Sequence, residues 1–470
     1  MAPLQLSPEE FHTLAQRVTD LSTRYLADLE TMRAYPKTSG REVADLFDRP
    51  LPQTGEGERA FADLEQVIAH CRPNVPRFYA YVLGAGDPVA ALGDYFASIL
   101  NQNVTAWRSS PAAVAIERSV INWLAQALGC NGFTGTLTAG GSAANLMALA
   151  IAREAKLPAN EHGVQRKGTI YASTEIHMSI GKAVAMLGIG RDNLRLVPVN
   201  SDHTINITNL DRMISDDVRA GYTPIAVLAS AGTVNTGAID DLQQVAAIAR
   251  KHNAWFHIDG AYGALAAIAV PKKFAGLDLA DSLSLDPHKW LYQPVDCGCL
   301  LYRDPGHARK AFAYTGDYTK VLNEDPLESF AFFEESMELS RRFRAMKLWL
   351  SLRYHGMDSF REAITNDLTL AQHLAKRING EPGLELLAPV TLSAVCFRYT
   401  QAPPERLNQL NAAILKRIIQ RGRVFISNAT LEGKFALRAC IVNQRATQAD
   451  VEEVVTETLA AAREVCNESS

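Results

Sequence analysis

Between residues 131 and 286 the chain alternates short apolar runs with helical stretches, and this rhythm constrains the fold more than any other feature. Residues 242–251 carry the helical pattern between two of the runs. Short buried strands that alternate with helices are typical of an α/β domain with a largely parallel sheet, whose ligands bind at the carboxyl ends of the strands. The apolar runs are rich in β-branched or aromatic side chains and cover residues 169–173, 194–199, 224–230, 254–259 and 282–286.

The first part of the chain, residues 1–88, has a different character. Ser7 is followed by Pro8 and two acidic residues, which predicts the start of a helix. A passage rich in proline and glycine, residues 36–57, then separates this helix from the next. Because this passage is too irregular to pack alone, we expect residues 1–88 to lie on a larger unit or on a partner subunit.

Two further parts follow. Residues 89–357 are predicted to form the large α/β domain. Helical patterns dominate residues 358–470, with strand candidates at 395–399 and 435–441, so we expect a smaller α+β domain there.

Composition excludes several classes of protein. The chain has 470 residues with a net charge of -4, which gives no electrostatic case for binding nucleic acid or a membrane surface. Its first residues lack the basic and apolar regions of a signal peptide, and its longest apolar run, residues 263–270, is too short to span a bilayer. Seven scattered cysteines suggest neither a disulfide framework nor a zinc site, so we expect no metal and a cytoplasmic location.

Two glycines and a serine stand where a helix is expected to begin. Gly140, Gly141 and Ser142 precede the apolar stretch 146–153. Glycines let the backbone approach a ligand closely, and the first N–H groups of a helix can bind an anion. The stretch lacks the lysine and the spacing of a nucleotide P-loop. It therefore predicts either a phosphate site or an ordinary helix start.

Two charged side chains stand at the ends of predicted strands. Asp259 ends one apolar run, and Lys289 follows another after Pro287 and His288. A buried ammonium is costly unless it is paired or neutral, and a buried carboxylate needs a partner, which a helix cap could also provide. A phosphate cradle, a strand-end aspartate and a strand-end lysine together suit pyridoxal 5'-phosphate (PLP). The lysine would form a Schiff base, and the aspartate would hold the pyridine nitrogen protonated.

With these residues the chain resembles a known family, the PLP-dependent group II amino-acid decarboxylases. The family includes aromatic-L-amino-acid, histidine and glutamate decarboxylases. The resemblance extends from about residue 76 to residue 465. It implies a fold type I enzyme, similar to aspartate aminotransferase, that acts on a small-molecule amino acid and shares its active sites between the subunits of a homodimer. The motifs that carry it are PRFYAYV (76–82), SSPAAVAIE (109–117), TAGGSAANLMAL (138–149), STEIHMSIGKA (173–183), ASAGTVNTGAID (229–240), HIDGAYG (257–263), DPHKW (286–290) and SRRFRAMKLW (340–349).

The resemblance gives roles to the residues that would hold the cofactor. Lys289 matches the Schiff-base lysine, and His288 matches a neighbouring phosphate contact. Gly141 and Ser142 match the phosphate-binding turn. Asp259 matches the partner of the pyridine nitrogen.

Four more residues match positions around the cofactor ring and the substrate. Ala261 would pack under the ring, and Thr233 would be a polar neighbour of the cofactor. His177 matches the histidine that stacks on the ring and helps to orient the substrate. Tyr318 matches the mobile-loop tyrosine that protonates the carbanion after carbon dioxide leaves.

The substrate side of the site favours an aromatic amino acid. Tyr81 and Val82 fall where the aromatic decarboxylases place pocket walls. Ser340 falls where family members for phenolic or imidazole side chains tend to carry serine. The expected reaction is therefore α-decarboxylation of an amino acid of the tyrosine, DOPA or tryptophan type.

Other features leave alternatives open. Asn103 and Thr105 occupy positions that are apolar in the aromatic enzymes, and Arg108 could pair with a substrate carboxylate or simply be exposed. Glutamate or aspartate is therefore the second substrate class. An aminotransferase or an aldehyde synthase of the same fold would share Lys289 and Asp259, and the tyrosine at position 318 disfavours the aldehyde synthase. A non-catalytic relative that only binds a ligand is disfavoured because every residue that the chemistry needs is present.

Overall fold

A seven-stranded sheet forms the centre of the protein. The computed structural model describes residues 4–314 and 325–468. The strand order is β1-β7-β6-β5-β4-β2-β3, and neighbours pair in parallel except that β7 runs antiparallel to both β1 and β6. The five predicted strands are β2 to β6, so the predicted sheet is confirmed. The bounds are β1 (Thr134–Thr138), β2 (Gly168–Ser173), β3 (Leu194–Val197), β4 (Thr223–Ser230), β5 (Trp255–Asp259), β6 (Ser282–Leu285) and β7 (Gly298–Tyr302).

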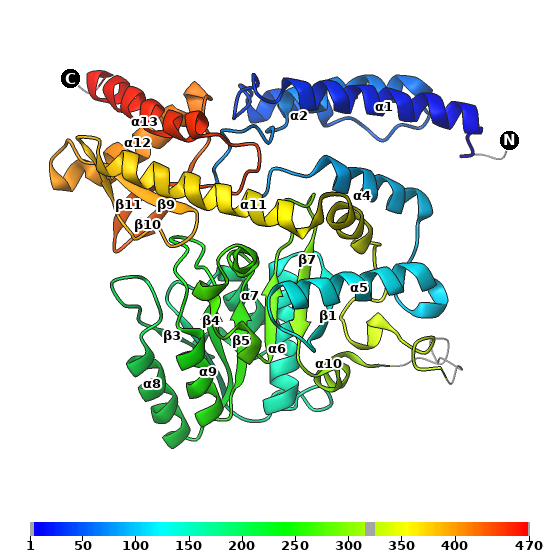
Figure 1. Ribbon diagram of the computed structural model, residues 1–470, viewed down its shortest axis with the longest axis vertical. Helices are drawn as coiled ribbons and strands as arrows, with labels where there is room; N and C mark the ends of the chain where they lie inside the picture. The colour runs from blue at the N-terminus through cyan, green and yellow to red at the C-terminus, as the bar shows by residue number, and fades with distance from the viewer. Residues whose placement is uncertain (1–3, 315–324, 469–470) are drawn as a thin grey trace.

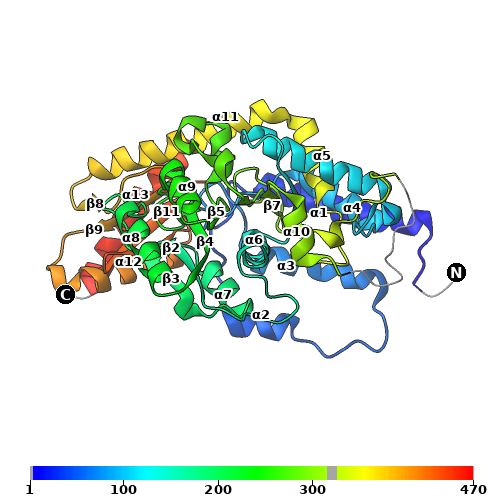
Figure 2. The same ribbon diagram turned by 90° about the horizontal axis from the view of Figure 1, so that it is seen from below.

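Helices cover both faces of this sheet because its strands are apolar on both sides. Ile170 and Leu228 pack in one core with α6, α7 and α10, whereas Tyr171 and Val227 pack in another core with α5, α8 and α9. Figure 2 shows α6 and α7 on one side of the strands and α5 and α9 on the other. The bounds are α5 (Pro111–Ala127), α6 (Gly141–Lys156), α7 (Met178–Met186), α8 (Ile207–Arg219), α9 (Leu242–Lys251) and α10 (Pro305–Phe312).

A smaller antiparallel sheet of four strands, in the order β10-β11-β9-β8, lies apart from the central one (Figure 1). The strand candidates at 395–399 and 435–441 are β9 and β11. With this second unit the predicted fold class, α/β with a smaller α+β part, is confirmed. The bounds are β8 (Leu384–Leu386), β9 (Ala394–Tyr399), β10 (Ser427–Leu431), β11 (Lys434–Cys440), α12 (Leu407–Arg421) and α13 (Gln448–Glu468).

One long helix, α11 (Ala345–Asn379), joins the two sheets (Figure 1). It contacts α4 (Pro88–Leu100) and α5 as well as α13 and β8. Its helical geometry is interrupted at Gly356, where φ is 74° and ψ is 156°, a conformation that glycine adopts readily. The predicted boundary at residue 357 falls beside this break, and the division into residues 1–88, 89–357 and 358–470 stays a prediction.

The N-terminal helices lie above the central sheet in Figure 1, where α1 runs across the top of the view. Ser7 caps α1 (Pro8–Asp28) in the predicted way, through a reciprocal pair of hydrogen bonds with Glu10. Two short helices, α2 (Gly40–Phe47) and α3 (Leu64–His70), follow. No helix in the described ranges combines the length and hydropathy needed to cross a membrane.

A buried carboxyl group on α11 should make stability depend on pH. Asp367 is fully buried and accepts hydrogen bonds from the Tyr292 hydroxyl (2.8 Å) and the Asn443 amide (3.0 Å). Burial raises the pKa of Asp367 to about 8. In the unfolded chain an aspartate titrates near pH 4, so between pH 5 and pH 8 only the folded state holds this proton. The group should lower the unfolding free energy by up to about 1.4 kcal/mol per pH unit as the pH rises through that window.

Urea unfolding of Asp367→Asn and of the wild type at pH 5, 6, 7 and 8 measures this effect. We expect the variant to gain stability relative to the wild type as the pH rises. Asp358→Asn is the matched control, because Asp358 lies on the same helix with an exposed side chain. A difference between Asp367→Asn and the wild type that stays constant with pH would contradict the raised pKa.

Candidate active site

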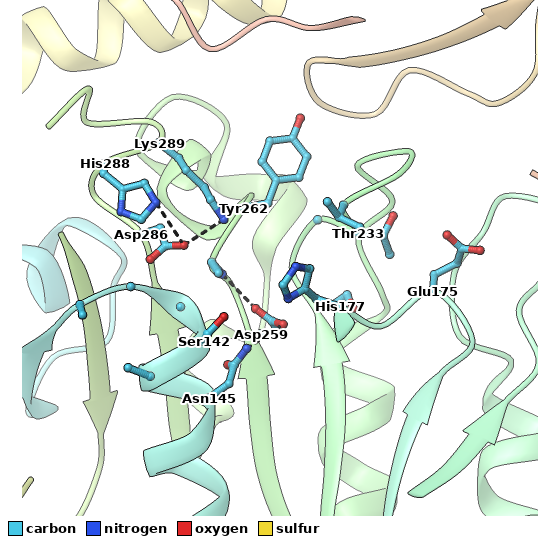
Figure 3. A pocket seen from close by; sticks show the side chains of 18 residues that line it. Ser142, Asn145, Glu175, His177, Thr233, Asp259, Tyr262, Asp286, His288 and Lys289 are labelled. Carbon is cyan, nitrogen blue, oxygen red and sulfur yellow. Dashed lines mark hydrogen bonds and ion pairs between the residues drawn. The ribbon is translucent and has the colours of Figure 1, made fainter. Parts of the chain in front are cut away.

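A cavity of about 410 Å³ opens at the carboxyl ends of β4, β5 and β6, beside the first turn of α6 (Figure 3). This is the edge of the sheet where the sequence predicts a ligand, and the volume is in the range of small-molecule sites. The cavity brings together eight of the predicted residues: Gly141, Ser142, His177, Thr233, Asp259, Ala261, His288 and Lys289.

The start of α6 has the form of an anion cradle. Its N-cap residue is Gly140, and no side chain caps the helix. A Cβ atom added to Gly141 would lie 2.7 Å from the Cβ of Ala261 and 3.0 Å from Oδ2 of Asp286, so only glycine fits there. The backbone can therefore approach a ligand closely, as the phosphate of PLP requires.

Lys289 reaches the cavity from the turn after β6. Its Nζ lies 2.9 Å from Oδ2 of Asp286, a carboxylate that is 3% exposed (Figure 3). The neighbouring His288 donates from Nδ1 to the carbonyl oxygen of Cys297 (2.7 Å), and burial lowers the pKa of His288. The ion pair with Asp286 holds the amine of Lys289 inside the cavity, where it can reach a bound aldehyde.

Asp259 ends β5 and is held by three donors. Its Oδ1 accepts hydrogen bonds from the Ala261 amide and the Ser284 hydroxyl, both at 3.2 Å. Its Oδ2 accepts a hydrogen bond from Nδ2 of Asn145 at 3.0 Å. The short helix that follows, Ala264–Ile268, has no side-chain cap, so Asp259 does not serve as a helix cap. An oriented, buried carboxylate at this edge suits a protonated ring nitrogen.

His177 is the N-cap residue of α7. Its Nδ1 lies 3.3 Å from the Ser179 amide nitrogen and 2.9 Å from the Ser179 hydroxyl. Burial lowers the pKa of His177. The ring is therefore neutral near pH 7, and because Nδ1 accepts these hydrogen bonds, Nε2 carries the proton.

The four predicted substrate residues do not line this cavity within one chain. Tyr81 is 60% exposed, and Val82 packs against the main core. Ser340 lines a separate hollow of about 420 Å³ together with Asn103. Thr105 has a buried hydroxyl that finds no hydrogen-bond partner in the described part of the chain.

Tyr318 lies outside the described residues, so its predicted role stays a prediction. Three residues at the site carry roles that the sequence did not predict: Asn145, Ser284 and Asp286. Asn145 and Asp286 stand inside motifs that were recognised, TAGGSAANLMAL and DPHKW, whereas nothing in the local sequence marks Ser284.

Comparison with known proteins agrees with this geometry. The family model described as "Pyridoxal-dependent decarboxylase conserved domain" matches residues 41–400. The chain is 32% identical to an aromatic-L-amino-acid decarboxylase of Bacillus atrophaeus, over 98% of this chain and 97% of that protein.

Two solved structures are similar over almost the whole chain. Tryptophan decarboxylase of Catharanthus roseus, in complex with L-tryptophan, has a TM-score of 0.90 and 28% identity, with 99% of this chain and 100% of that one covered. The 4-hydroxyphenylacetaldehyde synthase of Rhodiola rosea has a TM-score of 0.89 and 26% identity, with 98% and 99% covered. The chain therefore belongs to the PLP-dependent amino-acid decarboxylases, and PLP is its cofactor.

Proposed function

We propose that the protein removes the α-carboxylate of an aromatic L-amino acid as carbon dioxide and releases the amine. The observation that carries the proposal is the placement of Lys289, Asp259 and His177 around one cavity at the start of α6. The aromatic class is supported by the relatives, which include an aromatic-L-amino-acid decarboxylase and a tryptophan decarboxylase.

The residues of the cavity divide the work of holding the cofactor. When bound, PLP supplies an electron sink for the electron pair left as the bond between Cα and the carboxylate carbon breaks. Gly141 and Ser142 would hold its phosphate at the start of α6, and Asp259 would face its pyridine nitrogen. Lys289 supplies the amine that would bond to its aldehyde carbon.

The product needs a proton at Cα after carbon dioxide has left. We assign this proton to Tyr318, whose phenol is a donor and which matches the loop tyrosine of the family. His177, with its neutral ring, would lie on the cofactor face and orient the substrate, and its proton on Nε2 makes it the second candidate donor.

A second copy of the chain would complete the substrate pocket. The helix α4 carries an exposed apolar stripe at helical spacing, and its C-terminal end borders the hollow that contains Ser340. Covering this stripe with a partner subunit would bury it and bring Ser340 into an interface. Sedimentation should then give twice the mass of one chain. The homodimer and a cytoplasmic location both remain predictions. The stripe comprises Leu92, Tyr95, Phe96, Ile99 and Leu100.

Two alternatives rest on specific observations. An acidic substrate is favoured by Arg108, whose exposed guanidinium would pair with a carboxylate from the substrate. An aldehyde synthase is favoured by the likeness to the Rhodiola rosea enzyme. That reaction would consume oxygen and water and would release aldehyde, carbon dioxide, ammonia and hydrogen peroxide.

Product analysis distinguishes these functions. The PLP-loaded protein is incubated separately with tyrosine, DOPA, tryptophan, histidine, glutamate and aspartate, and amine, aldehyde, peroxide and carbon dioxide are measured. We expect amine and carbon dioxide in equal amounts from an aromatic substrate. Turnover of glutamate or aspartate alone would replace the proposed substrate class, and aldehyde with peroxide would replace the proposed reaction and the role of Tyr318.

A further inference from the structure

Asn145 lines the cavity, where it contacts Asp259 directly and His177 through Ser179. It stands on the second turn of α6 and is 1% exposed. Its Nδ2 lies 3.0 Å from Oδ2 of Asp259 and 3.2 Å from the hydroxyl of Ser179, and its Oδ1 lies 3.0 Å from Nε2 of His257. Figure 3 shows its side chain directed at Asp259. None of the roles described above accounts for a buried amide at this point.

The direction of these hydrogen bonds follows from their chemistry. A carboxylate only accepts, so the amide nitrogen of Asn145 must face Asp259 and its oxygen must face His257. The amide oxygen also only accepts, so His257 carries a proton on Nε2. His257 is fully buried, and burial lowers its pKa, which keeps the ring neutral and leaves Nδ1 as an acceptor.

Two more side chains continue this series into the core. Nδ1 of His257 lies 2.9 Å from the hydroxyl of Ser282, which must therefore donate to it. The same hydroxyl oxygen accepts a hydrogen bond from the indole N–H of Trp255 at 2.8 Å. Every donor in the series thus points the same way, from the start of β5 towards Asp259 at its end.

A branch of the series reaches His177. The hydroxyl oxygen of Ser179 accepts a hydrogen bond from Nδ2 of Asn145, so its own proton is directed at Nδ1 of His177, 2.9 Å away. The Ser179 amide points at the same nitrogen. This arrangement leaves the ring proton of His177 on Nε2. One amide group therefore supports both the carboxylate of Asp259 and the tautomer of His177.

We propose that Asn145 is a positioning residue that couples Asp259 to His177, holding the carboxylate in place and fixing which ring nitrogen of His177 carries the proton. The proposal rests on the proposed roles of Asp259 and His177 towards PLP and on no particular substrate. The alternative is that Asn145 only satisfies buried polar groups. The absorption spectrum of bound PLP distinguishes the positioning role from the purely structural one. A purely structural role would alter the stability of the protein and leave this spectrum unchanged.

The test compares Asn145→Leu, which has similar volume and no polar group, with Asn145→Thr, which keeps a polar donor on a shorter side chain. Loss of one hydrogen bond to a charged group corresponds to a change of about 10- to 100-fold. We expect Asn145→Leu to weaken PLP binding and to lower kcat within that range, with a shift in the pH dependence of the visible absorbance of the bound cofactor. Asn145→Thr should recover part of each change.

Asn411→Leu is the matched control. Asn411 is also fully buried, and among the described residues its hydrogen bonds go only to the backbone of Tyr399 and Leu407 in the smaller unit. The variant Asn411→Leu should be less stable than the wild type and should keep the wild-type spectrum of bound PLP and the wild-type pH profile. If Asn145→Leu behaves like Asn411→Leu in all three measurements, the positioning role is overturned.

Ser179→Ala keeps the proposal testable should Asn145→Leu fail to fold. It removes only the branch to His177, so we expect a changed pH profile of kcat/KM with PLP affinity within about twofold of the wild type, since no donor to Asp259 is lost. An unchanged pH profile would overturn the coupling to His177. Absence of amine from every aromatic substrate in the wild type would instead defeat the proposed function, while the spectra and affinities of the PLP-loaded variants would still decide the role of Asn145.

Discussion

Lys289→Arg should reduce amine release by at least about 10³-fold, within the range that a positioned reactive group supplies, while the protein remains folded. Lys289 is the one lysine among the described residues that line the cavity, and its amine is held at 2.9 Å by Asp286. Arginine preserves this ion pair, but its guanidinium stays protonated at every pH at which the protein is folded. It therefore cannot act as the nucleophile that binds an aldehyde.

Replacing Lys289 by arginine separates the loss of the nucleophile from the loss of stability that a missing ion pair would cause. Lys289→Ala would leave the buried carboxylate of Asp286 without its cation, which costs about 3–5 kcal/mol and could unfold the site. The measurements are amine release, the melting temperature, and the fixation of PLP to the protein by borohydride. Lys182→Arg, on the exposed face of the neighbouring α7, is the control and should match the wild type. Borohydride fixation of PLP in Lys289→Arg at the wild-type level would assign the covalent role to another residue.

The central strands could be predicted from sequence because a parallel strand is buried on both faces and so appears as a continuous apolar run. That argument also located Asp259 and Lys289 at one edge of the sheet. It did not reveal β1, whose sequence TGTLT is largely polar, or β7. Those two strands pair with each other in the register Thr134↔Tyr302, across more than 160 residues, and no local pattern encodes such a pairing.

The support of the site was harder to predict than its reactive groups. Asn145 and His257 are 112 positions apart, and Asn145 lies on a helix whose other buried residues are mainly apolar. The presence of a polar side chain among the buried residues of α6 is the only local sign that Asn145 has a hydrogen-bond partner. The predicted wall residues Tyr81 and Ser340 do not line the cavity within one chain, and the homodimer that would bring them to a shared pocket stays a prediction.

Among changes that keep the nucleophile, Asp259→Asn should have the largest effect. It should lower kcat by about 10²- to 10⁴-fold, the range typical of residues that donate or accept a proton in catalysis. The variant keeps the shape of the side chain and removes its charge, so a protonated ring nitrogen loses its counter-ion. The amide also cannot satisfy its surroundings. Whichever way it turns, its NH₂ group meets a donor, either Nδ2 of Asn145 or the amide of Ala261.

Asp240→Asn shows whether such a loss is specific to the cavity. Asp240 is also a buried carboxylate, it accepts hydrogen bonds from the Ser230 and Ile205 amides, and burial raises its pKa to about 6. Its variant shares the donor clash, because an NH₂ group at either position meets the Ser230 or the Ile205 amide, so it should lose stability. Asp240 does not line the cavity, so the variant should keep the spectrum of bound PLP and a kcat near that of the wild type. In Asp259→Asn the visible spectrum should change together with kcat. A drop in kcat without a spectral change would mean that Asp259 serves the fold of the site, and the negative charge opposite the ring nitrogen would have to come from another group.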